Sequence, residues 1–281
     1  RAVEAASAMN IPSVWLIHEM IDSYRKRKEF PEMKKAAAAA DLLIFNSRSS
    51  LARLPLLGEG LEEKATFVYF GINIPAKPET IDEARNSLGL ERKGHILGAV
   101  GDIAPVKGHK NLLKSFALLK NHFPETRLII VGRAPRQFEE FYSGIRRLGK
   151  ELGVSPDLIF AGEQKKIDLW LNSFDILIHS SRMESFGRAV VEALARAKPV
   201  VAVRTPGIAE IDAGEGIIPL VEPDDPGALS EQVRRLIESP SLRISQGTRG
   251  REMVRRRFDF SATLAQLELT IRGVLSVEKN D

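Results

Sequence analysis

Short apolar runs alternate along the chain with longer segments whose apolar residues recur at helical spacing. The first runs lie at 14–17, 41–45 and 66–70, and the alanine-rich stretch 36–40 is typical of the end of a helix. A second series follows, with runs at 96–100, 128–131, 158–160, 176–178, 200–203 and 217–220 and helical patterns at 111–122, 138–152, 167–174 and 226–237. Strands that alternate with helices predict an α/β fold, with parallel sheets covered by helices on both faces.

A stiff, polar stretch at 75–78, Pro-Ala-Lys-Pro, separates the two series of runs. Prolines at this spacing favour an extended connection, so we expect an interdomain linker here. A length of 281 residues also suits two domains better than one. In the second unit, Asp225 followed by Pro226 predicts a helix start, which explains the neighbouring acids better than a metal site does.

Composition and charge exclude several classes of protein. The net charge is only +4, aromatic residues make up 6%, and basic and aromatic residues do not interleave, so a nucleic-acid surface is not indicated. There are no cysteines, no apolar run reaches the ~20 residues of a membrane span, and no signal peptide is visible. We therefore expect a cytoplasmic protein. The basic cluster 25–28 indicates a solvated helix face, and a peripheral contact with the inner membrane surface stays open.

Polar or glycine-rich residues follow most of the predicted strands. In parallel sheets, ligands bind at the carboxyl ends of the strands. His18 follows the first strand of the chain, and the second series is followed by Gly101, Gly132 and Gly162. Lys107 lies in the loop 101–109, after the first strand of that series. These residues are candidates for one binding edge in each unit.

The nine residues 184–192, Glu-Ser-Phe-Gly-Arg-Ala-Val-Val-Glu, carry the strongest functional signal. They join the apolar strand 176–178 to a helical pattern. A helix N-terminus presents free N–H groups that can hold phosphate, and Gly187 allows a ligand to approach the backbone closely. Glu184 lies before the helix and Glu192 inside it, so both can face one ligand. An acidic helix start without a ligand is the alternative.

These motifs, in this order, resemble the retaining glycosyltransferases of the GT-B class, family 4 (glycosyl transferases group 1). The 184–192 pattern is similar to that family's pair of glutamates separated by seven residues, and Lys107-Gly108-His109 is similar to its Lys-Gly loop. The segments 198–201, 206–210, 214–216 and 222–225 resemble the family's strand, turn and loop on the C-terminal side of the glutamate pair. Upstream, 11–18, 40–47 and 71–73 resemble the end of the family's N-terminal domain, and 257–258 with the final helix resembles its returning segment.

The resemblance implies two Rossmann-like domains. Residues 1–74 would be the latter part of an incomplete N-terminal, acceptor-side domain, since about four strands normally precede the one at Val14. Residues 75–256 would bind the nucleotide-sugar donor, and 257–281 would return to the first domain. With half the cleft absent, we expect the 281 residues alone to have little transfer activity.

The resemblance also implies residue roles. Glu184 would bind the donor's sugar hydroxyls and Glu192 the ribose, while Lys107 would neutralise the diphosphate. The backbone at Ser185, Phe186 and Gly187 would cradle the phosphates, Gly101, Gly132 and Gly162 would border the nucleotide, and His18 would reach the sugar from the other domain. No cofactor and no metal is expected. His109 and His179 are weaker candidates.

One departure concerns the phosphate site. The family usually has arginine where this chain has Asp102, so the second cation on the diphosphate is missing from its usual place. Arg133, Arg182 or Arg188 would have to compensate. The usual Pro-Asn-Gly and Gly-Gly turns are also replaced, by 69–71 and by Pro206-Gly207.

The function that the resemblance implies is transfer of a sugar from a UDP- or GDP-linked donor to a glycan, lipid or small-molecule acceptor. Two alternatives remain. A non-catalytic nucleotide-sugar-binding module would bind the donor without turnover, and Asp102 favours this alternative. A sugar-nucleotide epimerase would convert the donor without any acceptor.

Overall fold

The computed structural model describes residues 2–18, 20–91 and 93–275, and the fold consists of two parallel α/β units. The first unit contains a three-stranded sheet in the order β1-β2-β3, formed by Val14–Ile17, Leu42–Phe45 and Ala65–Phe67. All its strand pairs are parallel, with Leu16 opposite Ile44 and Ile44 opposite Thr66. Glu19 and the end of the predicted returning segment, 276–281, lie outside the described residues.

The second unit contains a six-stranded parallel sheet in the order β6-β5-β4-β7-β8-β9. Its strands are β4 Ile96–Val100, β5 Arg127–Val131, β6 Leu158–Gly162, β7 Ile176–His179, β8 Val200–Val203 and β9 Leu220–Val221. The chain order reverses between β4 and β7, where β4 pairs with both β5 and β7. This is the kind of switch point at which ligands bind in open α/β sheets. The predicted parallel α/β class is confirmed.

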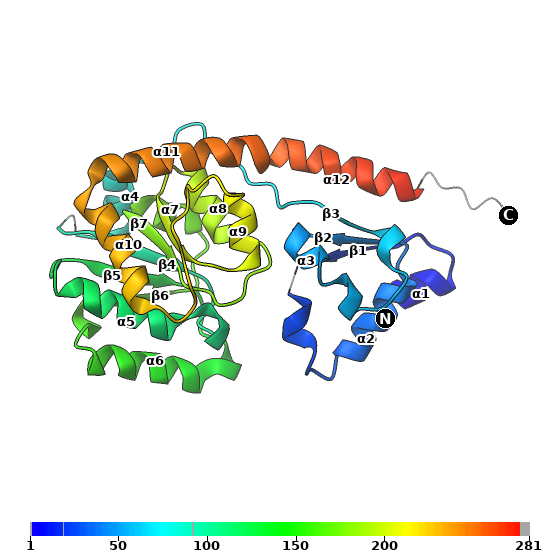
Figure 1. The fold of residues 1–281 in the computed structure, drawn as a ribbon, viewed down its shortest axis with the longest axis horizontal. Helices are drawn as coiled ribbons and strands as arrows, with labels where there is room; N and C mark the ends of the chain where they lie inside the picture. Colours follow the sequence, from blue (N-terminus) through cyan, green and yellow to red (C-terminus); the bar gives the residue numbers. More distant parts are fainter. Residues whose placement is uncertain (1, 19, 92, 276–281) are drawn as a thin grey trace.

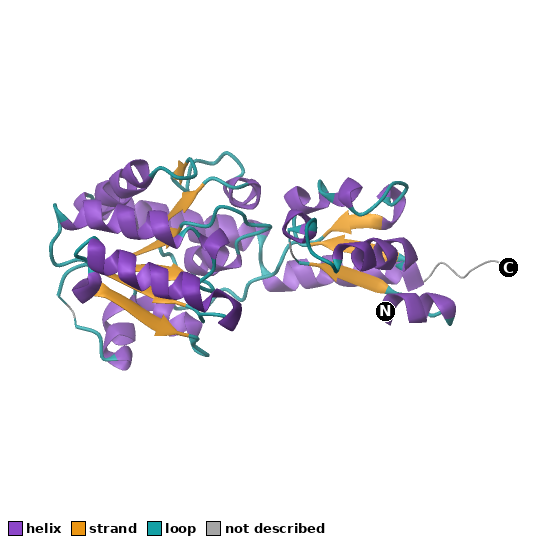
Figure 2. Ribbon diagram, turned by 90° about the horizontal axis from the view of Figure 1, so that it is seen from below, coloured by secondary structure: helices purple, strands orange, loops and turns teal. Residues whose placement is uncertain are grey.

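The helices follow the strands and cover the sheets (Figures 1 and 2). Those of the first unit are α1 Ala2–Ala8, α2 Phe30–Ala39 and α3 Arg48–Leu51. The second unit has α4 Ile81–Leu88, α5 His109–Lys120, α6 Glu139–Glu151, α7 Ile167–Ser173, α8 Arg188–Ala195, α9 Pro206–Asp212, α10 Pro226–Glu238 and α11 Pro240–Arg257, and α12 Phe260–Leu275 follows. Asp225 caps α10 as predicted, because its side chain accepts from the N–H of Ala228 at 2.8 Å.

The six-stranded sheet has a hydrophobic core on each face. Alternate residues of β4 point to opposite sides, so Ile96 joins one core and Leu97 the other. Both side chains are fully buried. This explains why the strands of the second unit appear in the sequence as continuous apolar runs rather than alternating ones.

One predicted strand is wrong. Residues 217–220 were expected to pair along their length, but β9 is only Leu220–Val221. The Asp212 carboxylate accepts the backbone N–H groups of Gly216, Ile217 and Ile218 at 2.8–3.1 Å. Because a side chain satisfies these donors, Ile217 and Ile218 stay buried without joining the ladder. The predicted strand 66–70 is likewise shorter, since β3 is Ala65–Phe67.

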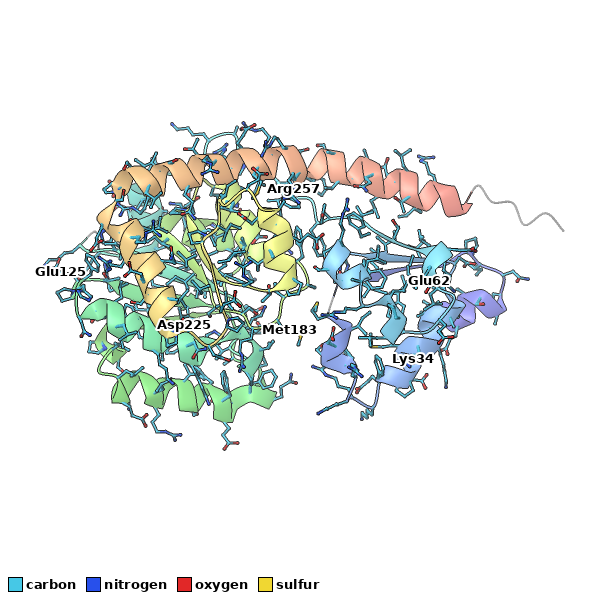
Figure 3. The ribbon with its side chains drawn as sticks, in the orientation of Figure 1. Lys34, Glu62, Glu125, Met183, Asp225 and Arg257 are labelled. Carbon is cyan, nitrogen blue, oxygen red and sulfur yellow. The ribbon has the colours of Figure 1, made fainter. Side chains whose placement is uncertain are left out.

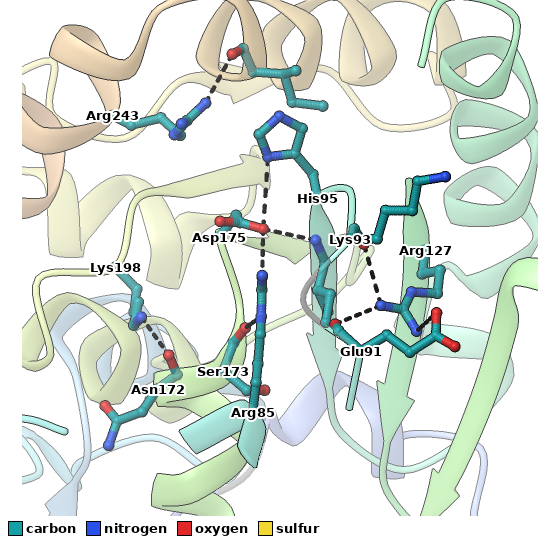
Figure 4. A network of polar contacts seen from close by, with 12 residues as sticks. Arg85, Glu91, Lys93, His95, Arg127, Asn172, Ser173, Asp175, Lys198 and Arg243 are labelled. Atoms are coloured by element: carbon teal, nitrogen blue, oxygen red, sulfur yellow. Dashed lines mark hydrogen bonds and ion pairs between the residues drawn. The ribbon is translucent and has the colours of Figure 1, made fainter. Parts of the chain in front are cut away.

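A buried ionic network fixes the amino ends of the central strands (Figure 4). The Asp175 carboxylate, just before β7, accepts from Arg85 at 2.6 Å and from the N–H of Ile96 at 2.7 Å. Burial raises the pKa of Asp175, but His95 and Arg85 more than offset this and hold it at about 2. Nearby, burial lowers the pKa of Lys198 to about 8, and its ammonium donates to the Asn172 carbonyl at 2.5 Å. These contacts anchor β4, β7 and α7 to one another.

Helices α11 and α12 run end to end along both units, with Arg257 where one gives way to the other (Figures 1 and 3). The predicted linker 75–78 forms neither helix nor strand. Beside it, Ile72 pairs with Asp259, and its N–H donates to the Phe258 carbonyl at 2.8 Å. The final helix therefore leaves the second unit next to the point where the chain enters it. No helix in the described ranges combines the length and the apolar character of a membrane span.

Candidate functional site

A pocket of about 320 Å³ lies at the carboxyl edge of the six-stranded sheet. Val100 and His179, the last residues of β4 and β7, form its floor, and α8 forms one wall. Its polar and glycine lining residues are Gly101, Lys107, His179, Glu184, Arg188 and Glu192. The structure therefore brings together four of the main sequence candidates, Gly101, Lys107, Glu184 and Glu192, with the weaker candidate His179 and the candidate second cation Arg188.

Glu184 is held by two basic side chains. Its Oε2 lies 2.9 Å from Nζ of Lys107 and 3.4 Å from Nε2 of His179. The lysine contact is a hydrogen bond, whereas the imidazole contact lacks hydrogen-bond geometry. Burial raises the pKa of Glu184, but His179 and Lys107 outweigh it and bring the value to about 2. Glu184 is thus a carboxylate at neutral pH, able to accept hydrogen bonds from hydroxyl groups.

The second acid of the motif has its own cation. Oε1 of Glu192 accepts from Nε of Arg188 at 2.7 Å, one turn earlier in α8. Arg188 is the first residue of that helix and lines the same pocket. Gly187 precedes it with φ +98°, a conformation that side chains disfavour, and a Cβ there would lie 2.3 Å from Cδ1 of Ile208. Glycine thus lets α8 begin at the pocket, which its first two residues, Arg188 and Ala189, both line.

Three glycines end adjacent strands beside this pocket. The N–H of Gly101 donates to Val131, and the N–H of Gly132 donates to Gly162, both at 2.9 Å. A Cβ on Gly132 would lie 2.0 Å from the Gly101 carbonyl oxygen, so the two loops touch through their backbones. Gly162 has a left-handed backbone, with φ +69°. The three glycines are therefore connected through their backbones, and of the three Gly101 lines the pocket.

Ser185 and Phe186 face away from the pocket, toward the first unit. The Ser185 hydroxyl donates to the His18 carbonyl at 3.0 Å, and its own carbonyl accepts from the Ser47 hydroxyl at 2.6 Å. Phe186 is 2% exposed and packs against Tyr69, Phe70 and Phe258. These side chains join the two units, so only their backbone could serve a ligand in the pocket.

His18 reaches the junction but not the pocket of Glu184. Its ring stacks on Phe70 with centroids 4.7 Å apart and lines an apolar hollow of about 240 Å³ between the three-stranded sheet and α12. The His18 carbonyl accepts from the side chains of Asn46 and Ser185. Ser185 directly follows Glu184 in the sequence. His18 is therefore tied by its backbone to the residue next to Glu184.

The arginines that could replace the missing cation have different partners. Arg133 pairs with Asp102 at 3.0 Å, and Arg182 pairs with Asp224 at 2.7 Å, both outside the pocket lining. Only Arg188 of the three lines the pocket. The acid at position 102 thus has a cation of its own on the neighbouring strand end.

Two residues gained importance from the structure. His179 is the last residue of β7, and its side chain is 6% exposed beside Glu184. In the sequence, its position at the end of a strand was the indication that it is a candidate. Glu210 accepts from the N–H groups of Arg48 and Ser49 and from the Tyr69 hydroxyl, all at 2.8 Å. It therefore links the two units, and no sequence signal identified that role.

Within the described ranges, no group of three His, Asp or Glu side chains is placed to hold a metal ion.

Two parallel α/β units joined in this way, with the pocket at the carboxyl edge of the second, define the GT-B type of fold. Anabaena HepE in complex with UDP and glucose is similar, with a TM-score of 0.87 and 22% identity, over 96% of this chain and 74% of that one. Sucrose-phosphate synthase from Thermosynechococcus elongatus is similar over 95% of this chain and 69% of its own, with a TM-score of 0.82 and 21% identity. At these identities the likeness concerns the fold.

The family is established by the sequence match. The model of the glycosyl transferases group 1 family matches residues 80–253, more than half of the chain, so this protein belongs to that family. D-inositol 3-phosphate glycosyltransferase 2 of Catenulispora acidiphila is 31% identical over 234 residues, 81% of this chain. N-acetyl-alpha-D-glucosaminyl L-malate synthase of Bacillus anthracis is 26% identical over 198 residues, 70% of this chain. The chain spans 55% and 50% of the lengths of these relatives.

Proposed function

We propose that the protein is a retaining glycosyltransferase that moves a sugar from a UDP- or GDP-linked donor to a glycan, lipid or small-molecule acceptor. The observation that carries the proposal is the pocket at the start of α8, in which two acids each pair with a base. Glu184 pairs with Lys107, and Glu192 pairs with Arg188. Family membership, and relatives named as glycosyltransferases, support it.

A pocket with paired charges suits a donor that carries both phosphates and hydroxyls. Lys107 and Arg188 neutralise Glu184 and Glu192 in the free protein. A diphosphate competes for both cations, and each acid then becomes available to accept hydroxyl hydrogen bonds from the sugar or the ribose. We propose that donor binding exchanges partners in this way, with Arg188 as the second cation in place of the arginine that Asp102 replaces.

In the transfer step, the bond between the anomeric carbon and the phosphate oxygen breaks, and the nucleoside diphosphate leaves with the bonding electrons. The acceptor oxygen bonds to the anomeric carbon on the same face, and its proton passes to the departing phosphate oxygen. Positive charge develops on the sugar ring and negative charge on the leaving group. Lys107, Arg188 and the first N–H groups of α8 would stabilise the latter, usually the largest catalytic term.

The remaining residues have supporting roles in this proposal. The glycines Gly101, Gly132 and Gly162 would let the nucleotide lie against the strand ends, and His18 would help to position the motif loop, because its carbonyl accepts from the Ser185 hydroxyl. Ser185 and Phe186 would hold the motif loop in place through their contacts with that unit. No metal is required, because the cations of the pocket provide the charge.

Calorimetry and product analysis test the proposal together. The protein should bind UDP or GDP, and their sugar conjugates, more tightly than the free nucleoside, and Lys107→Met should remove most of that difference. Release of nucleoside diphosphate should require an acceptor and should fall in Glu184→Gln. Binding without release by the full-length protein would favour a non-catalytic module, and conversion of the donor sugar without acceptor would favour an epimerase. Failure to bind any nucleotide sugar would refute the proposal.

A further inference from the structure

A second hollow, of about 590 Å³, is bordered by other residues of α7 and by the end of α8. The linker contributes Lys77 to its lining, and Glu79 directly follows the linker. Lys165 and Lys166 come from the turn before α7, and Arg196 comes from the C-terminal end of α8. The proposed transfer reaction makes no use of this hollow.

Positive charge predominates around it. Three lysines, Lys77, Lys165 and Lys166, are exposed and form no hydrogen bond or ion pair with any described residue. The guanidinium of Arg196 adds a fourth cation, against the two acids Glu79 and Asp168. Since Asp168 is already paired with Arg196, Glu79 is the acid of the lining that is left beside the three lysines, and the hollow has an excess of positive charge. Such a surface attracts anions.

Two buried polar groups in the lining point to a specific ligand. Arg196 is 8% exposed and Asn172 is 4% exposed, yet Nε of the former and Oδ1 of the latter have no hydrogen-bond partner among the described residues. Leaving a buried donor or acceptor unpaired is costly, so such atoms call for an explanation. Both atoms lie beneath the surface of the hollow, so a ligand with an anionic oxygen and a hydroxyl group would satisfy them by displacing the side chains that cover them.

Both groups are fixed in position by their other contacts. Nη1 of Arg196 donates to the Glu192 carbonyl at 2.9 Å, and Nδ2 of Asn172 donates to Glu79 at 3.5 Å. The backbone carbonyl of Asn172 accepts from Lys198 at 2.5 Å (Figure 4). The hollow is therefore bounded by a preformed polar wall, with exposed lysine side chains at its rim. Preformed polar groups with converging charge are typical of small-molecule sites.

We propose that this hollow binds a small phosphorylated, hydroxyl-bearing anion. The ligand's phosphate lies among Lys77, Lys165 and Lys166 and reaches Arg196, while a hydroxyl donates to Asn172. The site is separate from the donor pocket, although α7 and α8 border both: Ile167 and Glu192 line the donor pocket, and Asp168 and Arg196 line this one.

Calorimetry with inorganic pyrophosphate, glycerol 3-phosphate and glycerol tests the proposal. The double variant Lys107→Met/Arg188→Leu weakens the donor pocket as a competing phosphate site and serves as the background. We expect saturable binding of glycerol 3-phosphate and pyrophosphate, and none of glycerol. Adding Lys165→Glu and Lys166→Glu should weaken this binding at least about tenfold, because both reversed charges repel the ligand.

The matched control is Lys114→Glu/Lys150→Glu, which reverses two exposed lysines on α5 and α6, away from the hollow. This control should leave the binding unchanged, and thermal unfolding should show that all the variants fold. Equal weakening by both lysine pairs would indicate non-specific attraction and overturn the proposal. So would the absence of binding in the background variant, or binding that the Lys165/Lys166 change leaves intact. None of these outcomes depends on transfer activity.

Discussion

Replacing Arg188 by leucine should separate the recognition of phosphate from the recognition of the nucleoside. In the free protein Arg188 is 67% exposed and paired with Glu192, so its loss should cost only about 0.3–0.5 kcal/mol of stability, as for other exposed pairs one helical turn apart. A hydrogen bond between charged groups contributes roughly 1.5–3 kcal/mol. Because the side chain is mostly exposed, we expect the lower end, about tenfold weaker binding of UDP.

Calorimetry with UDP and with uridine measures both effects. Arg188→Leu should weaken UDP and leave uridine nearly unchanged, and high salt should weaken UDP less in the variant than in the native protein. Arg204→Leu is the control, because Arg204 also forms an exposed pair, with Glu222 at 2.8 Å, outside the pocket. If UDP binding survived in Arg188→Leu but fell in Lys107→Met, the assignment of the second cation would be wrong. Equal losses for UDP and uridine would point instead to a disturbed ribose site.

Three further predictions concern stability. Glu184→Gln should be less stable than the native protein above pH 4.5 by roughly 2–3 kcal/mol, because the fold stabilises ionised Glu184. This difference in stability should shrink as the pH falls from 4.5 toward about 2. Urea unfolding measures it across this range, and a constant difference would contradict the assignment. Burial lowers the pKa of His109 from 6.5 to about 4, so the free energy of unfolding of the native protein should fall by roughly 3 kcal/mol as the pH falls between these values. His109→Gln should abolish this pH dependence of stability in the same titration. Gly187→Ala should cost about 1–3 kcal/mol in chemical denaturation through its positive φ and its contact with Ile208, whereas Gly144→Ala, with open space around it in α6, should stabilise slightly; equal effects would disprove the backbone argument.

The fold could be predicted from the sequence where the strands are continuous apolar runs. Strands β1, β2, β4 and β8 lie where the pattern placed them, and in the second unit this is because both faces of the sheet are covered by helices. The pattern failed where side chains replace backbone partners, as at Asp212, whose carboxylate satisfies the donors of the expected strand. It also missed α11, a long helix rich in arginine with only a weak apolar face.

The pocket could be predicted in its composition but not in its pairing. The glutamates, Lys107 and the glycines came from motif spacing and from the rule that parallel strands bind ligands at their carboxyl ends. That Lys107 contacts Glu184 rather than Glu192 depends on the path of the loop 101–109, which no local pattern encodes. The side chains of Ser185 and Phe186 face the first unit because they contact its residues Ser47 and Phe70. These partners lie more than a hundred residues away in sequence.

The pairing of charges explains why the motif contains two acids in a pocket proposed to bind an anion. Unpaired, Glu184 and Glu192 would repel a diphosphate, and Lys107 and Arg188 alone would hold any anion without regard to its sugar. Paired, the cations become most readily available to a ligand that offers phosphate oxygens to them and hydroxyls to the acids at the same time. The donor must replace both ion pairs to bind, so inorganic phosphate, which offers no sugar hydroxyl to either acid, should bind this pocket poorly. Selectivity for nucleotide sugars over simple phosphates then depends on the glutamates as much as on the bases.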